Sequence, residues 1–273
     1  MPNSVKSVSG SKWRERPLIA TSIAIHGAAA AWTVLRPATW PWTLGAVAAN
    51  HLVLAGAGLW PRSSLLGPNH TRLPPSPGLT RVALTIDDGP DPEVTPRVLE
   101  ILARAEARAT FFCIGERVTA HAALARAIVA QGHRIENHSQ RHLHGFSLLG
   151  PRRMRAEVER AQQSIAAATG QEPRFFRAPA GLRNPFLEGV LATLDLSLVS
   201  WTRRGFDTVA REPGLVLARL TRNLAAGDIL LLHDGHAART ATGTPVVLEV
   251  LPGLLAAFRA ERLETVTLKS AIT

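Results

Sequence analysis

The stretch Val82-Ala-Leu-Thr-Ile-Asp-Asp-Gly-Pro-Asp-Pro92 decides the fold of this chain. Residues 82–86 are mainly apolar and predict a short buried strand. The strand stops at two adjacent carboxylates, Asp87 and Asp88, and Gly89-Pro90 then forces a turn. Two interpretations follow from the stretch alone. It is either an acidic solvated turn, or a site where one carboxylate holds a cation and the other moves protons.

The residues beyond this stretch predict alternating strands and helices. We expect Thr95 to cap the first helix, with Pro96 at its first helical position, and Gly132 and Gly227 to follow two later helices. The alternation predicts an α/β fold with a parallel sheet, open or closed as a barrel, and chemistry at the carboxyl ends of its strands. The predicted strands are 82–86, 109–114, 134–137, 174–177, 196–201, 229–233 and 265–268, and the predicted helices are 95–108, 117–131, 151–168, 185–194, 212–225 and 245–260.

Composition narrows the class of partner. The chain has 273 residues, of which 46% are hydrophobic and 19% charged, and its net charge is +10. It has no basic run with interleaved aromatic residues and no paired Cys/His motif, which argues against nucleic acid as a partner. The basic charge suits a membrane surface or an anionic, phosphate-linked substrate. Cys113 is the only cysteine, so no internal disulfide can form, and its apolar surroundings predict a small core residue.

The N-terminal part divides into segments of different composition. Residues 1–17 form a basic tail, and residues 18–60 hold two uncharged runs, 18–35 and 38–60, whose lengths approach the roughly 20 residues that span a bilayer. Tryptophans lie near the ends of these runs, as is typical of membrane interfaces. Residues 61–78 are rich in Pro, Gly and Ser and predict a linker, so we expect the catalytic domain to occupy residues 79–273.

Three interpretations of the two apolar runs remain open at this point. They are membrane-spanning segments, a signal peptide followed by a second run, or buried helices of a soluble domain. We favour attachment to the inner, cytoplasmic membrane. A hairpin of two spans returns the chain to its starting side, and the basic tail favours the cytoplasm for that side, in agreement with Arg62, Arg72 and Arg81.

Polar residues recur at the predicted strand ends, whereas the strand bodies are apolar. His138 and His142 are spaced so that one helical turn would bring both imidazoles to one side, where a carboxylate would complete a three-ligand metal site. A solvated His-rich loop is the alternative, and His233, after three leucines, is on its own more typical of a core histidine. The residues at strand ends are Asp87, Asp88, His138, His142, Arg177, Trp201, Asp207 and His233.

These residues resemble the motifs of the polysaccharide deacetylases with the NodB-homology domain, the fourth carbohydrate esterase family. The resemblance covers about residues 80 to 268 and leaves the N-terminal 78 residues unexplained. The matching motifs are Thr85-Ile-Asp-Asp-Gly-Pro90, His138-Ser-Gln-Arg-His142, Arg177-Ala-Pro-Ala-Gly181, a partial fourth motif with Trp201 and Asp207, and Leu231-Leu-His233.

The resemblance implies a distorted (β/α) barrel and a role for each matching position. A divalent metal, usually zinc, would be bound by Asp88, His138 and His142. Asp87 would be the general base, held ionised by Arg177. His233 would protonate the leaving amine, and Asp207 would tune it. The positions implied to contact substrate are Leu231, Trp201, Pro179, Ala180 and Gly181.

One position departs from the family pattern. The fourth residue of the third motif is usually aromatic in the family, and here it is Ala180. Its backbone N–H can still bind an oxyanion, but the missing ring reshapes the substrate groove and argues against long polymers. We therefore expect a membrane-attached metal hydrolase that removes an acyl group, most simply acetyl, from an amino sugar of a glycan or a lipid-linked saccharide. The alternatives are a deformylase of a lipid-linked formamido sugar, a non-catalytic membrane scaffold and a soluble deacetylase.

Overall fold

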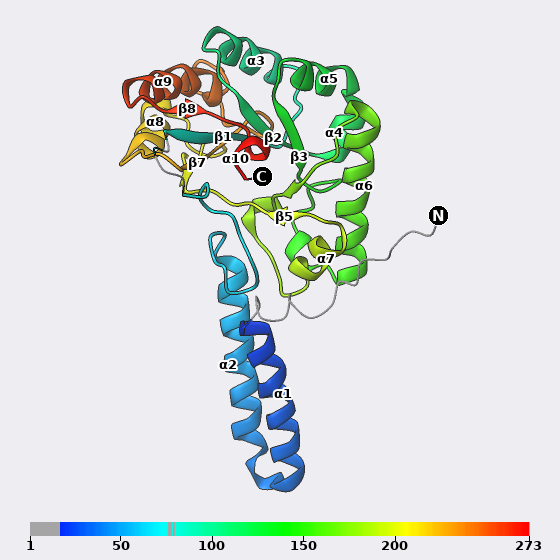
Figure 1. Ribbon diagram of the computed structural model, residues 1–273. Coiled ribbons are helices and arrows are strands. Elements are labelled where there is room, and N and C mark those ends of the chain that lie inside the picture. Colours follow the sequence, from blue (N-terminus) through cyan, green and yellow to red (C-terminus); the bar gives the residue numbers. More distant parts are fainter. Residues whose placement is uncertain (1–16, 76–77, 79, 273) are drawn as a thin grey trace.

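A parallel sheet forms the centre of the computed structural model, which describes residues 17–75, 78 and 80–272 (Figure 1). Its described strands follow the order β5-β4-β3-β2-β1-β7-β6, and β8 pairs with β1. All the strand pairs are parallel, which confirms the predicted (β/α) architecture. The strands are β1 (Arg81–Asp87), β2 (Ala109–Cys113), β3 (Arg134–Asn137), β4 (Phe175–Phe176), β5 (Ser197–Leu198), β6 (Arg203–Arg204), β7 (Ile229–His233) and β8 (Glu264–Thr265).

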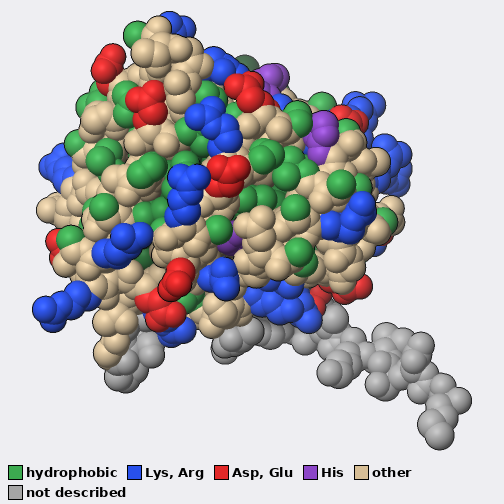
Figure 2. All heavy atoms as spheres, turned by 90° about the horizontal axis from the view of Figure 1, so that it is seen from above, with side chains coloured by type: hydrophobic (Ala, Val, Ile, Leu, Met, Phe, Trp, Pro, Cys, Tyr) green, Lys and Arg blue, Asp and Glu red, His purple; other side chains and the backbone are tan. Residues whose placement is uncertain are grey.

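Helices cover the outside of this sheet (Figure 1). They are α3 (Thr95–Arg104), α4 (Gly115–Ala120), α5 (Ala122–Ala130), α6 (Pro151–Thr169), α7 (Leu187–Thr193), α8 (Pro213–Thr221), α9 (Val246–Ala260) and α10 (Leu268–Ala271), with short 3-10 turns η2 (Phe146–Leu148) and η3 (Pro179–Gly181). The face opposite the N-terminal helices carries basic and acidic side chains interspersed, as is expected of a solvated surface (Figure 2).

Strand β1 shows why the sequence folds in this way. Successive side chains of a strand point to opposite faces. Val82, Leu84 and Ile86 belong to the main hydrophobic core together with residues of α3 and α9, whereas Thr85 and Asp87 bond to the buried Arg177 on the other face. The same strand therefore supplies a hydrophobic layer outside and a polar layer inside the curled sheet.

Three local predictions were wrong. The helix predicted over 117–131 is interrupted at His121, whose backbone is not helical (φ −122°, ψ 45°), although neither Gly nor Pro marks the break. Thr95 does not cap α3, because Val94 occupies the cap position and the Thr95 hydroxyl instead donates to Asp234. Leu268 begins α10 rather than ending the last strand. Strand β6 was not predicted at all.

The N-terminal helices α1 (Pro17–Leu35) and α2 (Trp40–Leu59), joined by η1 (Pro37–Thr39), form a hairpin that projects from the domain (Figure 1). Asn50 donates to Ser22 across the hairpin at 2.7 Å, and the Thr33 and Thr43 hydroxyls are 2.7 Å apart. Both helices are long and apolar enough to cross a membrane. Their exposed large apolar side chains are Ile23, Trp32, Val34, Leu35, Trp40, Trp42, Leu44, Leu52, Val53 and Leu59.

This exposure speaks against the interpretation of the two runs as core helices of a soluble domain. A core helix buries its apolar side chains, and a soluble surface seldom carries so large a continuous apolar area. The two hydrogen-bonded contacts between α1 and α2 are of the kind that is typical of helices packed together in a bilayer. The basic tail lies almost wholly outside the described residues.

The segment that follows the hairpin packs on the domain. Leu66 and Leu73 are buried, and the carbonyls of Pro61 and Ser63 accept hydrogen bonds from Ser200 and Arg183. The composition of residues 61–78 predicts a linker, but residues 61–75 contribute side chains to the folded body. The predicted boundary at residue 79 lies outside the described residues, and the division into segments stays a prediction.

We expect a chain shortened to begin at residue 79 to be less stable than one that begins at residue 61. The shorter chain loses two leucines that are 1% and 3% exposed, and each such loss costs about 2–5 kcal/mol. Urea unfolding of the two shortened chains measures the difference. Equal unfolding free energies would show that residues 61–78 are only a linker.

Candidate active site

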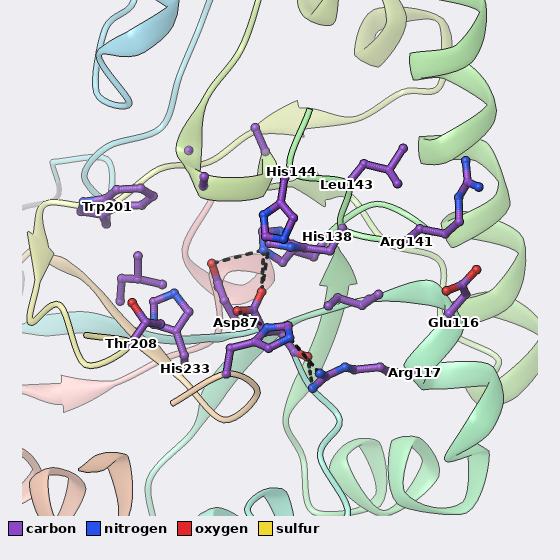
Figure 3. A pocket seen from close by; sticks show the side chains of 18 of the residues that line it. Asp87, Glu116, Arg117, His138, Arg141, Leu143, His144, Trp201, Thr208 and His233 are labelled. Atoms are coloured by element: carbon purple, nitrogen blue, oxygen red, sulfur yellow. Dashed lines mark hydrogen bonds and ion pairs between the residues drawn. The ribbon is translucent and has the colours of Figure 1, made fainter. Parts of the chain in front are cut away.

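The carboxyl ends of the parallel strands surround one cavity of about 640 Å³ (Figure 3). Asp87 is the last residue of β1, and the strand register pairs it with Phe112 of β2 and with His233 of β7. His138 follows β3 directly. In Figure 3, Trp201, Thr208 and His233 lie to one side of Asp87, and Glu116 and Arg117 lie to the other. The predicted strand-end residues therefore do meet.

Asp88, His138 and His142 converge on one point. Asp88 Oδ1 is 3.2 Å from His138 Nε2 and 3.3 Å from His142 Nε2. This oxygen is buried and has no hydrogen-bond partner among the described residues. Three ligands at the usual zinc distances in a tetrahedral arrangement are about 3.3 Å apart. The orphaned oxygen and the two ring nitrogens, which all lie within 4.8 Å of one another, could therefore hold a small divalent cation.

A loop, and not the predicted helical turn, brings the two histidines together. Ser139 and His142 both have left-handed backbones, with φ of 64° and 51°. The His142 N–H donates to Ser139 Oγ at 3.1 Å, and the Ser139 N–H donates to Asn137 Oδ1 at 2.9 Å. These bonds fold residues 137–142 into a compact turn, in which the two imidazole centroids are 4.8 Å apart.

The protonation states of the three groups suit metal binding. A carbonyl can only accept, so His138 Nδ1 donates to the Arg177 carbonyl at 2.8 Å and leaves the Nε2 lone pair free. Burial and the neighbouring His138 lower the pKa of His142 to about 4. Burial opposes protonation of His138, but Asp87 and Asp88 raise its pKa, and a metal ion takes the place of that proton. Although burial raises the pKa of Asp88, the neighbouring imidazoles of His138 and His236 hold it well below its usual range.

Asp87 is bound by a buried arginine and not by the two histidines. Arg177 Nη1 donates to Asp87 Oδ1 at 2.6 Å, and the other carboxylate oxygen, Oδ2, lies 3.8 Å from His138 Nε2. Asp87 therefore keeps a free oxygen beside the metal-ligand group without joining it. Three further donors of Arg177 are taken by the Thr85 hydroxyl and by the carbonyls of Val199 and Ser200.

His233 is held by Asp207 through two bonds. His233 Nδ1 lies 2.9 Å from Asp207 Oδ1, and the His233 backbone N–H donates to Oδ2 at 2.7 Å. Since a carboxylate accepts, Nδ1 carries a proton. Burial alone would lower the pKa of His233, but the charge and hydrogen bond of Asp207 raise it to about 9. A protonated imidazole beside the cavity is a proton donor at neutral pH.

Comparison with known proteins agrees with this geometry. The polysaccharide deacetylase family model matches residues 76–199. A peptidoglycan-N-acetylglucosamine deacetylase of Bacillus cereus is 32% identical over 175 residues, which make up 63% of this chain and 81% of that protein. The chain belongs to the polysaccharide deacetylase family. It is therefore a hydrolase of carbon–nitrogen bonds, as predicted.

Solved structures show the same fold with and without activity. A family 4 carbohydrate esterase of Streptomyces lividans, solved with acetate, is 32% identical, with a TM-score of 0.62 over 68% of this chain and 91% of that one. A CE4 family pseudoenzyme of Bacillus anthracis is 25% identical, with a TM-score of 0.67 over 76% of this chain and 69% of that one. The same fold therefore occurs with and without activity, and the chemistry depends on the residues of the site.

The walls of the deacetylase cavity include four of the five predicted substrate-contact residues. The four are Leu231, Trp201, Ala180 and Gly181. The fifth, Pro179, is buried and does not line the cavity, whereas its neighbour Ala178 does. Ala180 has a left-handed backbone (φ 54°). Gly181 (φ 73°) has no room for a side chain, because a methyl group there would approach Trp201 to 2.6 Å and Pro61 to 2.9 Å.

Three residues around the metal-ligand group were given no role from the sequence. His236 Nδ1 is 3.2 Å from Asp88 Oδ2, and Arg117 donates to the Asp88 carbonyl at 3.0 Å. Asp234 is buried against the turn after Asp88, and a methyl group on Gly89 would lie 2.4 Å from its carboxylate. Burial and nearby Asp88 raise the pKa of Asp234 to about 7, although a hydrogen bond from Thr95 opposes this shift. The only feature of the sequence that could have indicated them is the cluster of two histidines and an acid at residues 233–236.

We expect Asp207→Asn to move the basic limb of the pH–activity profile to lower pH. His233 donates only when it is protonated, so activity falls as the pH rises past its pKa, about 9 in the native protein. Without the Asp207 charge, burial still lowers the pKa of His233, and the limb should move down by about 1–3 pH units. The measurement is kcat/KM against pH. An unmoved basic limb would mean that His233 is not the proton donor.

Proposed function

We propose that this hydrolase removes the acetyl group from the nitrogen of an acetylated amino sugar, N-acetylglucosamine being the first candidate. The observation that carries the proposal is the meeting of a three-ligand group, a separate carboxylate and a protonated imidazole in one cavity. The name of the Bacillus cereus relative supports the choice of sugar.

The proposed roles follow from the contacts. Asp88, His138 and His142 would hold a divalent metal, for which zinc is our proposal. When bound, such an ion polarises the amide carbonyl and acidifies water. Asp87, ionised against Arg177, takes a proton from the attacking water through its free oxygen.

The leaving nitrogen and the acyl group need further contacts. His233 gives a proton to the leaving nitrogen, and Asp207 fixes the orientation of its ring. The Ala180 N–H is proposed as the oxyanion donor. The apolar Leu231 side chain lines the cavity and would contact the acetyl methyl group.

A lipid-linked saccharide is the substrate form we favour over a free glycan. The wall at Gly181 and Trp201 is supported from behind by Pro61, two residues after the end of α2. Arg183 N–H also donates to the carbonyl of Gly58 in the last turn of α2, at 3.1 Å. If the hairpin crosses the membrane, the cavity lies close to its surface, where a lipid-linked sugar is available. A formyl group on the same type of substrate is the second candidate, because its removal needs the same residues.

The function is tested by incubating the metal-loaded full chain with soluble chito-oligosaccharides and with polyprenyl-linked acetylated or formylated amino sugars. Mass spectrometry would detect the loss of one acetyl or formyl unit, and metal analysis would show one ion per chain. Efficient deacetylation of the soluble sugars, with none of the lipid-linked ones, would contradict the lipid-linked proposal. No release from any substrate by the loaded protein would contradict the hydrolytic function.

The side of the membrane is a separate proposal. We propose that both ends of the hairpin, and hence the domain, face the cytoplasm. A reporter that is active only outside the cytoplasm, fused after Thr273, should be inactive, whereas a reporter active only in the cytoplasm should work. The opposite pattern would contradict the proposed cytoplasmic side.

A further inference from the structure

Arg204 lines the cavity from strand β6 and is held there by aromatic rings. Its guanidinium carbon is 5.4 Å from the centre of the Trp201 ring and 5.0 Å from that of Phe206. Cation–π contacts of this kind fix the position of a guanidinium but leave its N–H donors unsatisfied.

The other arginines of the cavity are committed to protein acceptors. Arg117 donates to the Asp88 carbonyl, and Arg141 pairs with the buried Glu157 at 2.7 Å. The Arg204 side chain has neither an ion pair nor a hydrogen bond among the described residues, and its Nε is buried without an acceptor. A buried charged donor without a partner is costly, so the arrangement favours a bound anion.

The surroundings of Arg204 place this cation near the end of the hairpin. Arg62, three residues beyond α2, donates to the carbonyl of Thr202 at 3.4 Å, and the Thr202 hydroxyl donates to Thr71 at 2.7 Å. On the other side, Phe206 and Val209 expose apolar side chains, which are 45% and 73% accessible. A cation between the membrane-proximal segment and an apolar surface suits a ligand that is both anionic and lipidic.

We propose that Arg204 binds the phosphate that joins the amino sugar to its lipid. The substrate class is then an N-acylated amino sugar attached to a membrane lipid through a phosphate or diphosphate. A planar guanidinium forms paired, charge-assisted hydrogen bonds to phosphate oxygens, and the two rings hold it in position before the substrate arrives. The inference deepens the proposed function and rests on it for the reaction, but the binding step stands on its own.

The test compares two substrates that differ only in the linkage. One is N-acetylglucosamine joined to a polyprenol through diphosphate, and the other is a neutral alkyl glycoside of N-acetylglucosamine. Arg204→Gln should lower kcat/KM for the first by about 10- to 100-fold, mainly through KM, because charge-assisted bonds are lost. It should change kcat/KM for the second by less than about twofold, since no phosphate is bound.

Arg219→Gln is the matched control. Arg219 also lies over the Phe206 ring, at 5.5 Å, and its removal deletes one positive charge from the same region. It does not line the cavity, so it should leave the discrimination between the two substrates unchanged. An equal loss of substrate discrimination in both variants would overturn the proposal in favour of a general charge effect.

The remaining outcomes separate this inference from the proposed function. If Arg204→Gln lowers activity on both substrates equally, Arg204 only supports the wall, and the inference fails while the function stands. The same holds if neither activity changes.

Titration calorimetry with the diphosphate-linked sugar measures binding without turnover. Suppose that Arg204→Gln binds this sugar more weakly than wild type does, and that wild type releases no acetate from it. The inference would then be supported, and the proposed deacetylation would be contradicted. If the variant loses binding only to vesicles containing phosphatidylglycerol, the ligand is a lipid headgroup, and the inference is overturned.

Discussion

Asp87→Asn is expected to reduce acetate release by about 10²- to 10⁴-fold and to leave one metal ion bound per chain. Asn has the size of Asp but cannot accept the proton of the attacking water. The group that could hold the metal consists of Asp88, His138 and His142, whereas the Asp87 carboxylate bonds to Arg177. This variant should therefore lose activity while its metal content stays the same.

Two further variants define the result. Asp88→Asn should lose metal and activity together, because its carboxylate faces both imidazoles at 3.2 and 3.3 Å. Asp91→Asn, in the same stretch, should keep both. Asp91 does not line the cavity, and Asn can also accept from the backbone N–H groups of Glu93 and Val94. The ion pair that Asn would lose, with Arg117, is long, at 3.9 Å. Equal rates for wild type and Asp87→Asn would favour a different base, or the non-catalytic scaffold.

Arg177→Met is expected to lower the free energy of unfolding by about 3–5 kcal/mol. The side chain is 1% exposed, so its removal leaves the Asp87 carboxylate buried without its counter-charge. The carbonyls of Val199 and Ser200 would also lose a donor. Urea unfolding at constant metal concentration measures the loss, and activity should fall with it because Asp87 is no longer held.

Arg174→Met is the surface control for this prediction. Arg174 pairs with Asp195 at 3.4 Å, but the side chains are 61% and 95% exposed, and such pairs contribute less than about 1 kcal/mol. Similar losses in the two variants would show that burial of the Arg177–Asp87 pair is not what stabilises this part of the sheet. Arg177→Lys, which keeps the charge but has fewer donors, should fall between the two.

Much of the fold could be read from the sequence because local patterns determine it. The apolar residues of 82–86 and 229–233, each ending in a polar residue, correspond to β1 and β7. Gly132 and Gly227, predicted to follow helices, have left-handed backbones in turns after α5 and α8. The break at His121 could not be predicted, because no helix-breaking residue marks it.

The site was predictable as a set of residue types but not as an arrangement. Aspartate and histidine at strand ends pointed to a cation site, because a parallel sheet brings its carboxyl ends together. Whether His138 and His142 meet through a helix or a loop depends on the bonds of Ser139, which the spacing does not reveal. His236 gave no signal of its own, since it follows His233 in a turn whose direction is set by β7.

The sequence alone determined the fold class, the candidate metal ligands, the second carboxylate and the two apolar N-terminal runs, because each depends on residue type and short-range spacing. Only the tertiary structure decided that His236 contacts Asp88, 148 residues away, that Pro61 supports the wall at Gly181, and that the Arg204 side chain is left without an acceptor in the described part of the chain. The physical reason is that a buried charge takes its partner from whatever the folded chain brings within reach, and the distance along the sequence carries no information about that choice.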